Sequence, residues 1–293
     1  MIDWLFLFEV TLAGIGSGGL YALAGLAFVI VYKATRVVNL AIGEMLMMGA
    51  YFFFGFAAQL QWPLWLAALL AIVAGGVMGG VIERLAIRPM LGESPISVFM
   101  VTVGLGSIMV GLVELIWSAD QRRLPEFIPS EPIFIGEAFV SSKVFYSFLV
   151  ALALVAMVVA VFRYWRGGVA LRATASDQGA AYAMGINVPR VFSLAWVASA
   201  ALAAVAGIAV GAIGGLSSSM GIFGLSVLVV VIVGGLDSVI GAMLAGLLIG
   251  ILEAWAGAYL GGEYKLLVTF MVLVVVLMAR PYGLFGTREI ERL

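Results

Sequence analysis

The 293-residue chain is 64% hydrophobic and only 11% charged, with a formal net charge of −1. Soluble domains carry about 25% charged residues, so the composition predicts an all-α polytopic membrane protein, with residues 1–293 forming a single transmembrane domain. The chain has no Cys, no His and no G-x-x-x-x-G-K-S/T phosphate loop, which excludes disulfides, imidazole or thiolate metal sites and ATP binding of the P-loop kind.

Apolar runs predict helices at 4–32, 38–58, 63–83, 95–117, 144–162, 191–213, 222–235, 238–259 and 265–279. Most are long enough to cross a hydrocarbon core about 30 Å thick. The first run lacks a basic n-region and a cleavage site, so we expect a retained helix. The run at 222–235 is short and flanked by Gly, which is typical of a broken or re-entrant helix. We therefore expect eight to nine transmembrane helices.

Basic residues predict the orientation, because Lys and Arg favour cytoplasmic loops. The loops after the first, third and fifth predicted helices carry most of the Lys and Arg residues. The loops on the opposite side have fewer basic residues and more acidic ones. This places the N-terminus outside and the C-terminus in the cytoplasm. The predicted cytoplasmic residues are Lys33, Arg36, Arg84, Arg88, Arg163, Arg166, Arg172 and Arg190, followed by Arg280, Arg288 and Arg292 in the tail.

Three carboxylates, Glu44, Glu114 and Glu253, fall inside predicted helices, and no Lys or Arg lies inside a helix to pair with them. A charge at the bilayer centre costs at least about 2.5 kcal/mol, so such residues usually face the protein interior or water. Glu114 and Glu253 share stripes with Gly, which predicts close helix contacts, and we favour a role in tying helices together for both. Glu44 shares its face with Tyr51 and lies beside a stripe containing Asn39 and Gly43. A pathway role and a helix tie both remain open for Glu44.

The polar segment at about 163–190 predicts a short amphipathic helix outside the membrane. Ser176 is the expected N-cap, Asp177 is favourable in the first turn, and Gly185 is the expected stop. Small side chains give it a surface that suits docking into another protein, although an ordinary interfacial helix remains the alternative. The residues assigned to this helix are Ser176, Asp177, Ala180, Ala181, Met184 and Gly185.

Five stretches together resemble the LivH-like permeases of branched-chain amino acid ABC importers. They are GGLYALAGLAFVIVY, NLAIGEMLMMGAY, RATASDQGAAYAMGINVPRVF, VIVGGLDSVIGAMLAGLLIGILEA and ARPYGLFG, and they run from about residue 18 to 286 in the family's order. The family commonly has a His where this chain has Ile42, which we place on an apolar arc away from Glu44.

The resemblance implies a non-catalytic permease in the bacterial inner membrane, without cofactor or metal. Its implied partners are a second homologous permease, two cytoplasmic ATP-binding subunits, a periplasmic solute-binding protein and the lipid bilayer, but no nucleic acid. The segment Ser176–Met184 resembles the family's coupling helix, which seats in an ATPase groove. The transport pathway would form between the two permeases, and we assign Asn39, Gly43, Glu44 and Tyr51 to it. Substrates would be branched-chain or other hydrophobic amino acids. Urea, short amides or aromatic acids are the alternatives, and an H⁺-coupled secondary transporter is a further one.

Overall fold

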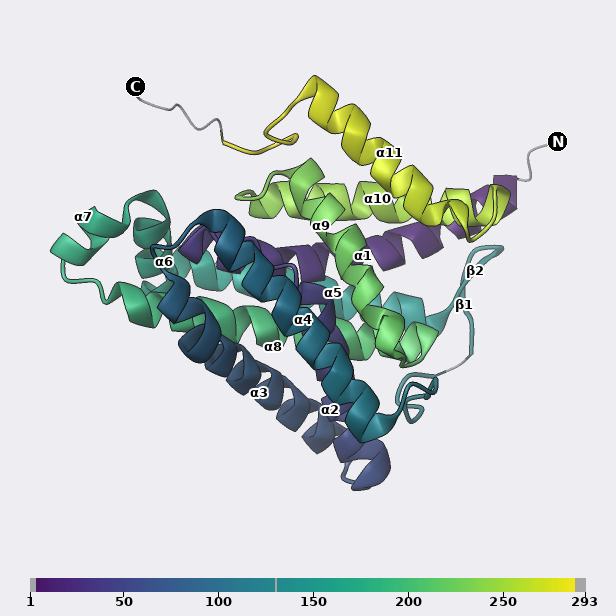
Figure 1. Ribbon diagram of the computed structural model, residues 1–293. Coiled ribbons are helices and arrows are strands. Elements are labelled where there is room, and N and C mark those ends of the chain that lie inside the picture. Colours follow the sequence, from purple (N-terminus) through teal and green to yellow (C-terminus); the bar gives the residue numbers. More distant parts are fainter. Residues whose placement is uncertain (1–3, 130, 288–293) are drawn as a thin grey trace.

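The computed structural model describes residues 4–129 and 131–287. Nearly all of the regular secondary structure in these residues is helical (Figure 1). A π-helical turn, Gly55–Gln59, extends the helix α2 (Ile42–Phe54), and the helix α3 (Leu64–Ile82) continues through a π turn, Glu83–Ile87, and a 3₁₀ turn, Arg88–Met90. The α-helices are α1 (Trp4–Thr35), α2 (Ile42–Phe54), α3 (Leu64–Ile82), α4 (Pro95–Trp117), α5 (Ser142–Tyr164), α6 (Arg166–Ser176), α7 (Gln178–Ala183), α8 (Val188–Gly214), α9 (Phe223–Gly234), α10 (Val239–Tyr259) and α11 (Tyr264–Ala279). A 3₁₀ segment, η4 (Ser218–Ile222), precedes α9.

The expected mainly helical membrane fold is confirmed in its broad form. In the part of the chain that the structure describes, six helices are long and apolar enough to cross a membrane: α1, α3 with its extension, α4, α5, α8 and α10. The segments Ser218–Gly234 and Tyr264–Ala279 are apolar but shorter. The outward faces of α3, α4 and α5 carry many exposed apolar side chains, as expected for surfaces that meet lipid.

Two local features differ from the sequence-based expectation. The helix predicted at 38–58 begins only at Ile42, because residues 38–41 are not helical and the amides of Leu40 and Ala41 donate hydrogen bonds to the side chains of Thr102 and Asn39. The segment between the helices predicted at 95–117 and 144–162 contains a short antiparallel hairpin of β1 (Ile133–Ile135) and β2 (Ala138–Val140). Alternation over three residues is too short a signal to predict such a strand.

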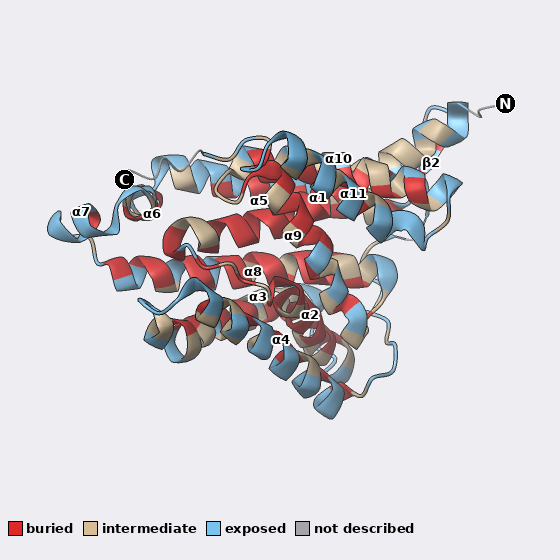
Figure 2. Cartoon of the chain, turned by 45° about the horizontal axis from the view of Figure 1, so that its top comes forward, coloured by how far each residue is buried: buried red, intermediate tan, exposed pale blue. Residues whose placement is uncertain are grey.

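Close contacts between glycines spaced four residues apart hold α1 and α10 together. Gly14 and Gly18 of α1 face Gly250 and Gly246 of α10, and a Cβ added to Gly18 would lie 2.8 Å from the Cα of Leu247. Figure 2 shows buried residues concentrated along α1, α8 and α9, with exposed residues on the outward face of α4. Helices that approach this closely bury their backbones against one another, which compensates for the lack of a hydrophobic driving force in lipid.

The two ends of the bundle differ. The start of α1 and the hairpin lie at one end, and α6 and α7 lie at the other (Figure 1). After α11 the chain returns to the end of α9, where the amide of Leu284 donates to the carbonyl of Val233 at 2.8 Å and that of Phe285 to Gly234 at 3.1 Å. Arg280 lies in this returning segment, whereas Arg288 and Arg292 lie outside the described residues.

Candidate functional site

A cavity of about 400 Å³ lies between α2, α4 and α9, and we call it the α2–α4–α9 cavity. Its walls combine a carboxylate with apolar and small polar side chains. The lining residues used below are Asn39, Ile42, Glu44, Thr102, Gly106 and Leu225. This mixture of apolar wall and few polar groups is typical of sites for small molecules.

Glu44 enters the cavity from the first turn of α2, opposite the middle of α4. A Cβ added to Gly106, the midpoint of α4, would lie 3.2 Å from the Glu44 Cδ, and one added to Gly221 would lie 2.9 Å from its Oε1. The Oε2 atom is buried and accepts no hydrogen bond from any residue that the structure describes. A carboxylate oxygen buried in this way needs a proton, water or a cationic ligand group to satisfy it.

The cavity lies where two short helices begin side by side. Gly43 of α2 meets Gly221 and Gly224, so that a Cβ on Gly43 would overlap the carbonyl oxygen of Gly221 and lie 2.8 Å from the Cα of Gly224. Only Gly permits this approach without a shift of the backbone. The N-termini of α2 and α9, which carry partial positive charge, therefore lie close to the same cavity.

The structure brings only part of the predicted pathway set to this cavity. Asn39 and Glu44 line it, while Gly43 lies at the α2–α9 contact. Tyr51 does not line it, because its fully buried ring packs on Trp117 with 5.3 Å between ring centroids. The placement of Ile42 away from Glu44 is wrong: both line the cavity, which extends around the first turn of α2.

Thr102 is a lining residue that sequence reasoning missed. Its Oγ1 accepts a hydrogen bond from the amide of Leu40 at 3.2 Å and donates one to the carbonyl of Phe99 at 2.8 Å. It thereby joins α4 to the non-helical segment before α2. The spacing of Thr102 and Gly106, one helical turn apart on α4, is the sequence signal that could have identified this face.

The other two intramembrane carboxylates have opposite surroundings. Glu253 of α10 is 8% exposed and accepts hydrogen bonds from Tyr21 of α1 at 2.6 Å, Ser226 of α9 at 3.3 Å and Thr269 of α11 at 2.5 Å. It ties four helices together, as the sequence indicates. The matching expectation for Glu114 is wrong within this chain, because α4 packs by its opposite face and leaves Glu114 exposed.

The segment between α5 and α8 contains two helices instead of the single one expected. Ser176 ends α6, and the N-cap of α7 is Asp177, whose Oδ1 accepts a hydrogen bond from the amide of Ala180 at 2.9 Å. The predicted cap is therefore wrong by one residue, since α6 continues through Ser176 and Asp177 is the first residue with an extended backbone. Gly185 has a φ of 84° and follows α7, as predicted.

The exposed surface of α7 differs from the predicted small-residue surface. Ala181 is only 4% exposed, so it faces its own chain and is not available for docking. Tyr182 and Met184 are 72% and 82% exposed, and Ala180 is exposed beside them. Two large apolar side chains at the tip of the segment are typical of a protein contact surface.

Within residues 4–129 and 131–287, no group of three or more acidic, His or Cys side chains is arranged to hold a metal ion.

The model of a protein family described as the permease component of branched-chain amino acid transport systems matches residues 10–277 of the chain. The high-affinity branched-chain amino acid transport permease LivH of Salmonella typhimurium is 32% identical, with 99% of each chain covered. The corresponding permease BraD of Pseudomonas aeruginosa is 31% identical over 95% of each chain. Among solved structures, PsaBC of Streptococcus pneumoniae, in complex with a Fab, has a TM-score of 0.50 at 13% identity, covering 94% of this chain and 92% of that one. This last likeness concerns the fold alone.

Proposed function

The chain belongs to the family of branched-chain amino acid transport permeases, and from this premise we propose that it is the membrane-spanning permease of an ABC importer. It would move branched-chain or other hydrophobic amino acids into the cytoplasm, powered by partner ATPases. The observation that carries the proposal is the family relationship, which extends over almost the whole chain.

We assign the transport pathway to the α2–α4–α9 cavity. An amino acid substrate has an ammonium group, a carboxylate and an apolar side chain. Glu44 supplies an unpaired acceptor for the ammonium group, the N-termini of α2 and α9 favour the carboxylate, and Ile42 and Leu225 supply apolar wall. Broken helices that meet near the middle of the membrane form substrate sites in many transporters.

A second permease subunit would complete this pathway. α4 is mostly exposed in the single chain, and Ser107, which lines the cavity, is exposed too. Gly104 and Gly111 on the same face of α4 have no neighbour within 4 Å of an added Cβ. Burying this face against a homologous partner would enclose the cavity and shield the otherwise exposed Glu114 from lipid.

For the topology, we propose nine crossings in a bacterial inner membrane, with α2 and α9 as shortened ones. The N-terminus then lies outside, and the end of the bundle that carries α6 and α7 lies in the cytoplasm. This orientation is supported by the basic residues at that end, among them Arg84, Arg88, Arg166 and Arg190. One of the two ATP-binding subunits would dock at α7 and the other on the partner permease, and a periplasmic solute-binding protein would deliver substrate to the opposite end.

Reconstitution tests this proposal. The chain, its partner permease, the two ATPases and the binding protein are placed in proteoliposomes, and uptake of labelled leucine is measured with and without ATP. We expect uptake only with ATP and the complete set of subunits. Uptake that persists without the ATPases and follows a pH gradient would instead establish a secondary transporter. Competition by urea, short amides or aromatic acids distinguishes the alternative substrates.

A further inference from the structure

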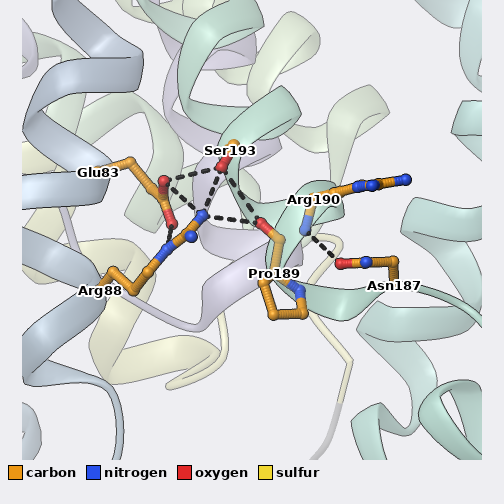
Figure 3. A network of polar contacts seen from close by, with 6 residues as sticks. All are labelled: Glu83, Arg88, Asn187, Pro189, Arg190 and Ser193. Carbon is orange, nitrogen blue, oxygen red and sulfur yellow. Dashed lines mark hydrogen bonds and ion pairs between the residues drawn. The ribbon is translucent and has the colours of Figure 1, made fainter.

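An ion pair between a buried Glu83 and a partly exposed Arg88 lies where α3 ends, close to the α6–α7 end of the bundle. Glu83 is 1% exposed, and Arg88 binds it with both arms of its guanidinium group, Nε to Oε1 at 3.0 Å and Nη2 to Oε2 at 3.0 Å (Figure 3).

The π turn of α3 makes this pairing possible. Residues five apart in an α-helix differ by about 140° in direction and do not meet. In the turn Glu83–Ile87 the amide of Arg88 instead donates to the carbonyl of Glu83, so the helix widens and the two side chains reach each other. Pro89 follows directly and cannot donate an amide hydrogen bond to the preceding turn, which favours a local departure from α geometry.

The ion pair also reaches α8. Ser193 donates a hydrogen bond to Glu83 Oε2 at 2.8 Å and accepts one from Arg88 Nη2 at 2.7 Å. The same Nη2 lies 3.2 Å from the carbonyl oxygen of Pro189 in the first turn of α8. Three side chains and one backbone carbonyl thus join the end of α3 to the beginning of α8 (Figure 3).

The beginning of α8 is also the point where the α7 segment enters the bundle. Asn187 caps α8, its Oδ1 accepting a hydrogen bond from the amide of Arg190 at 3.1 Å, and α7 ends only at Ala183. Farther along, α8 packs closely on α3, where a Cβ on Gly75 would lie 2.8 Å from the Cβ of Ala204. A displacement of α7 would therefore move the beginning of α8 first, and then α3, which packs against α8.

We propose that Glu83, Arg88 and Ser193 form a clamp that makes α3 move with α8 when α7 is displaced by an ATPase partner. The clamp rests on the proposed function, and its members are positioning residues that do not touch the substrate. Ion pairs add little net stability whether they are exposed or buried, and fixing the register between elements is the best-attested use of those with a buried partner. A link between two helices beside the docking segment is such a use.

Transport per ATP hydrolysed by the reconstituted complex tests the clamp. Arg88→Gln breaks the ion pair, while Arg84→Gln removes the same charge from an exposed neighbouring position and serves as the control. We expect Arg88→Gln to lower the ratio of substrate taken up to ATP hydrolysed by about fivefold or more, the lower range of coupling between sites. Arg84→Gln should leave the ratio near the wild-type value. An unchanged ratio in Arg88→Gln overturns the clamp.

A reversible cross-link gives a second test that does not depend on how Arg88→Gln folds. The chain has no Cys, so Glu83→Cys with Ser193→Cys and Arg88→Gln provides two unique thiols in place of the clamp. A short bifunctional thiosulfonate reagent should bridge the two thiols and raise the ratio of substrate taken up to ATP hydrolysed in this variant. A reductant should remove the bridge and lower the ratio again. Bridging that leaves the ratio low, or that stops uptake, overturns the clamp. Failure of the wild-type complex to show ATP-driven uptake would instead refute the proposed function, and the clamp with it.

Discussion

Replacing Glu253 with Ala removes the acceptor that joins α1, α9, α10 and α11. Thr269 keeps a second acceptor, the carbonyl of Lys265 at 3.1 Å. The hydroxyls of Tyr21 and Ser226 are held in the buried interior by Glu253, at 2.6 and 3.3 Å. The substitution therefore removes three interhelical hydrogen bonds at once, those donated by Tyr21, Ser226 and Thr269.

The expected loss follows from the energy of such bonds in lipid. Interhelical hydrogen bonds in membrane proteins average about 0.6 kcal/mol each and reach about 1.7 kcal/mol, so losing three costs about 2–5 kcal/mol. Glu114 provides the matched control, because it is also a Glu in a predicted spanning helix but its side chain is exposed. Glu114→Ala should change the free energy of unfolding of the isolated chain by no more than about 0.5 kcal/mol.

Unfolding of the purified chain by a denaturing detergent measures both variants against the wild type. Glu253→Ala should lower the free energy of unfolding by the stated amount, and Ser226→Ala by a smaller part of it. Equal stability of Glu253→Ala and Glu114→Ala would show that the hydroxyls find other partners and that the carboxylate does not tie the four helices.

Three further predictions concern the proposed pathway, α7 and the interior. Glu44→Gln should leave assembly intact but lower uptake by the reconstituted complex, because the cavity loses its acceptor for an ammonium group; unchanged uptake at every substrate concentration and pH would leave Glu44 only a packing role. Met184→Arg should weaken binding of the ATPase subunits in a pull-down, whereas Ala181→Arg should lower the thermal stability of the chain itself, since only Met184 is exposed; normal ATPase binding by Met184→Arg would remove α7 as the docking surface. Gly207→Val should lower the free energy of unfolding by at least about 1–3 kcal/mol in the same detergent assay, because its Cβ would overlap the carbonyl oxygen of Leu46. Wild-type stability of this variant would mean that α2 and α8 can separate freely.

The sequence predicted the elements with strong hydrophobic signals and missed those set by local backbone geometry. Long apolar runs identified every helix from α1 to α5 and from α8 to α11, including the short α9. The late start of α2 goes with hydrogen bonds that the amides of Leu40 and Ala41 donate to side chains, and the one to Thr102 of α4 is a long-range contact that the local sequence does not predict. The cap at Asp177 was displaced by one residue because both Ser and Asp are good caps and their order does not decide between them.

The candidate site was predictable in part for a similar reason. A carboxylate in an apolar run signals its own importance, so Glu44 and Glu253 were both identified from sequence. Helical periodicity assigned Tyr51 to the face of Glu44, but that face passes from the cavity to the Trp117 contact within two turns. The clamp could not be predicted from the sequence, because Glu83 and Arg88 meet only in a π turn. Their five-residue spacing argues against contact in an ordinary α-helix.

α8 links the two proposed working parts of the molecule. At its beginning, Ser193 of α8 belongs to the clamp and donates a hydrogen bond to Glu83. Farther along, Gly207 of α8 lies against the backbone of Leu46, two residues after Glu44 on α2. Close backbone contact leaves little room for sliding, so α8 and α2 should move together. The two parts should nevertheless fail in different ways. Loss of the Glu44 carboxylate should change how uptake depends on substrate concentration while ATP use per molecule transported stays constant, whereas loss of Arg88 should change ATP use per molecule and leave the substrate dependence as it was.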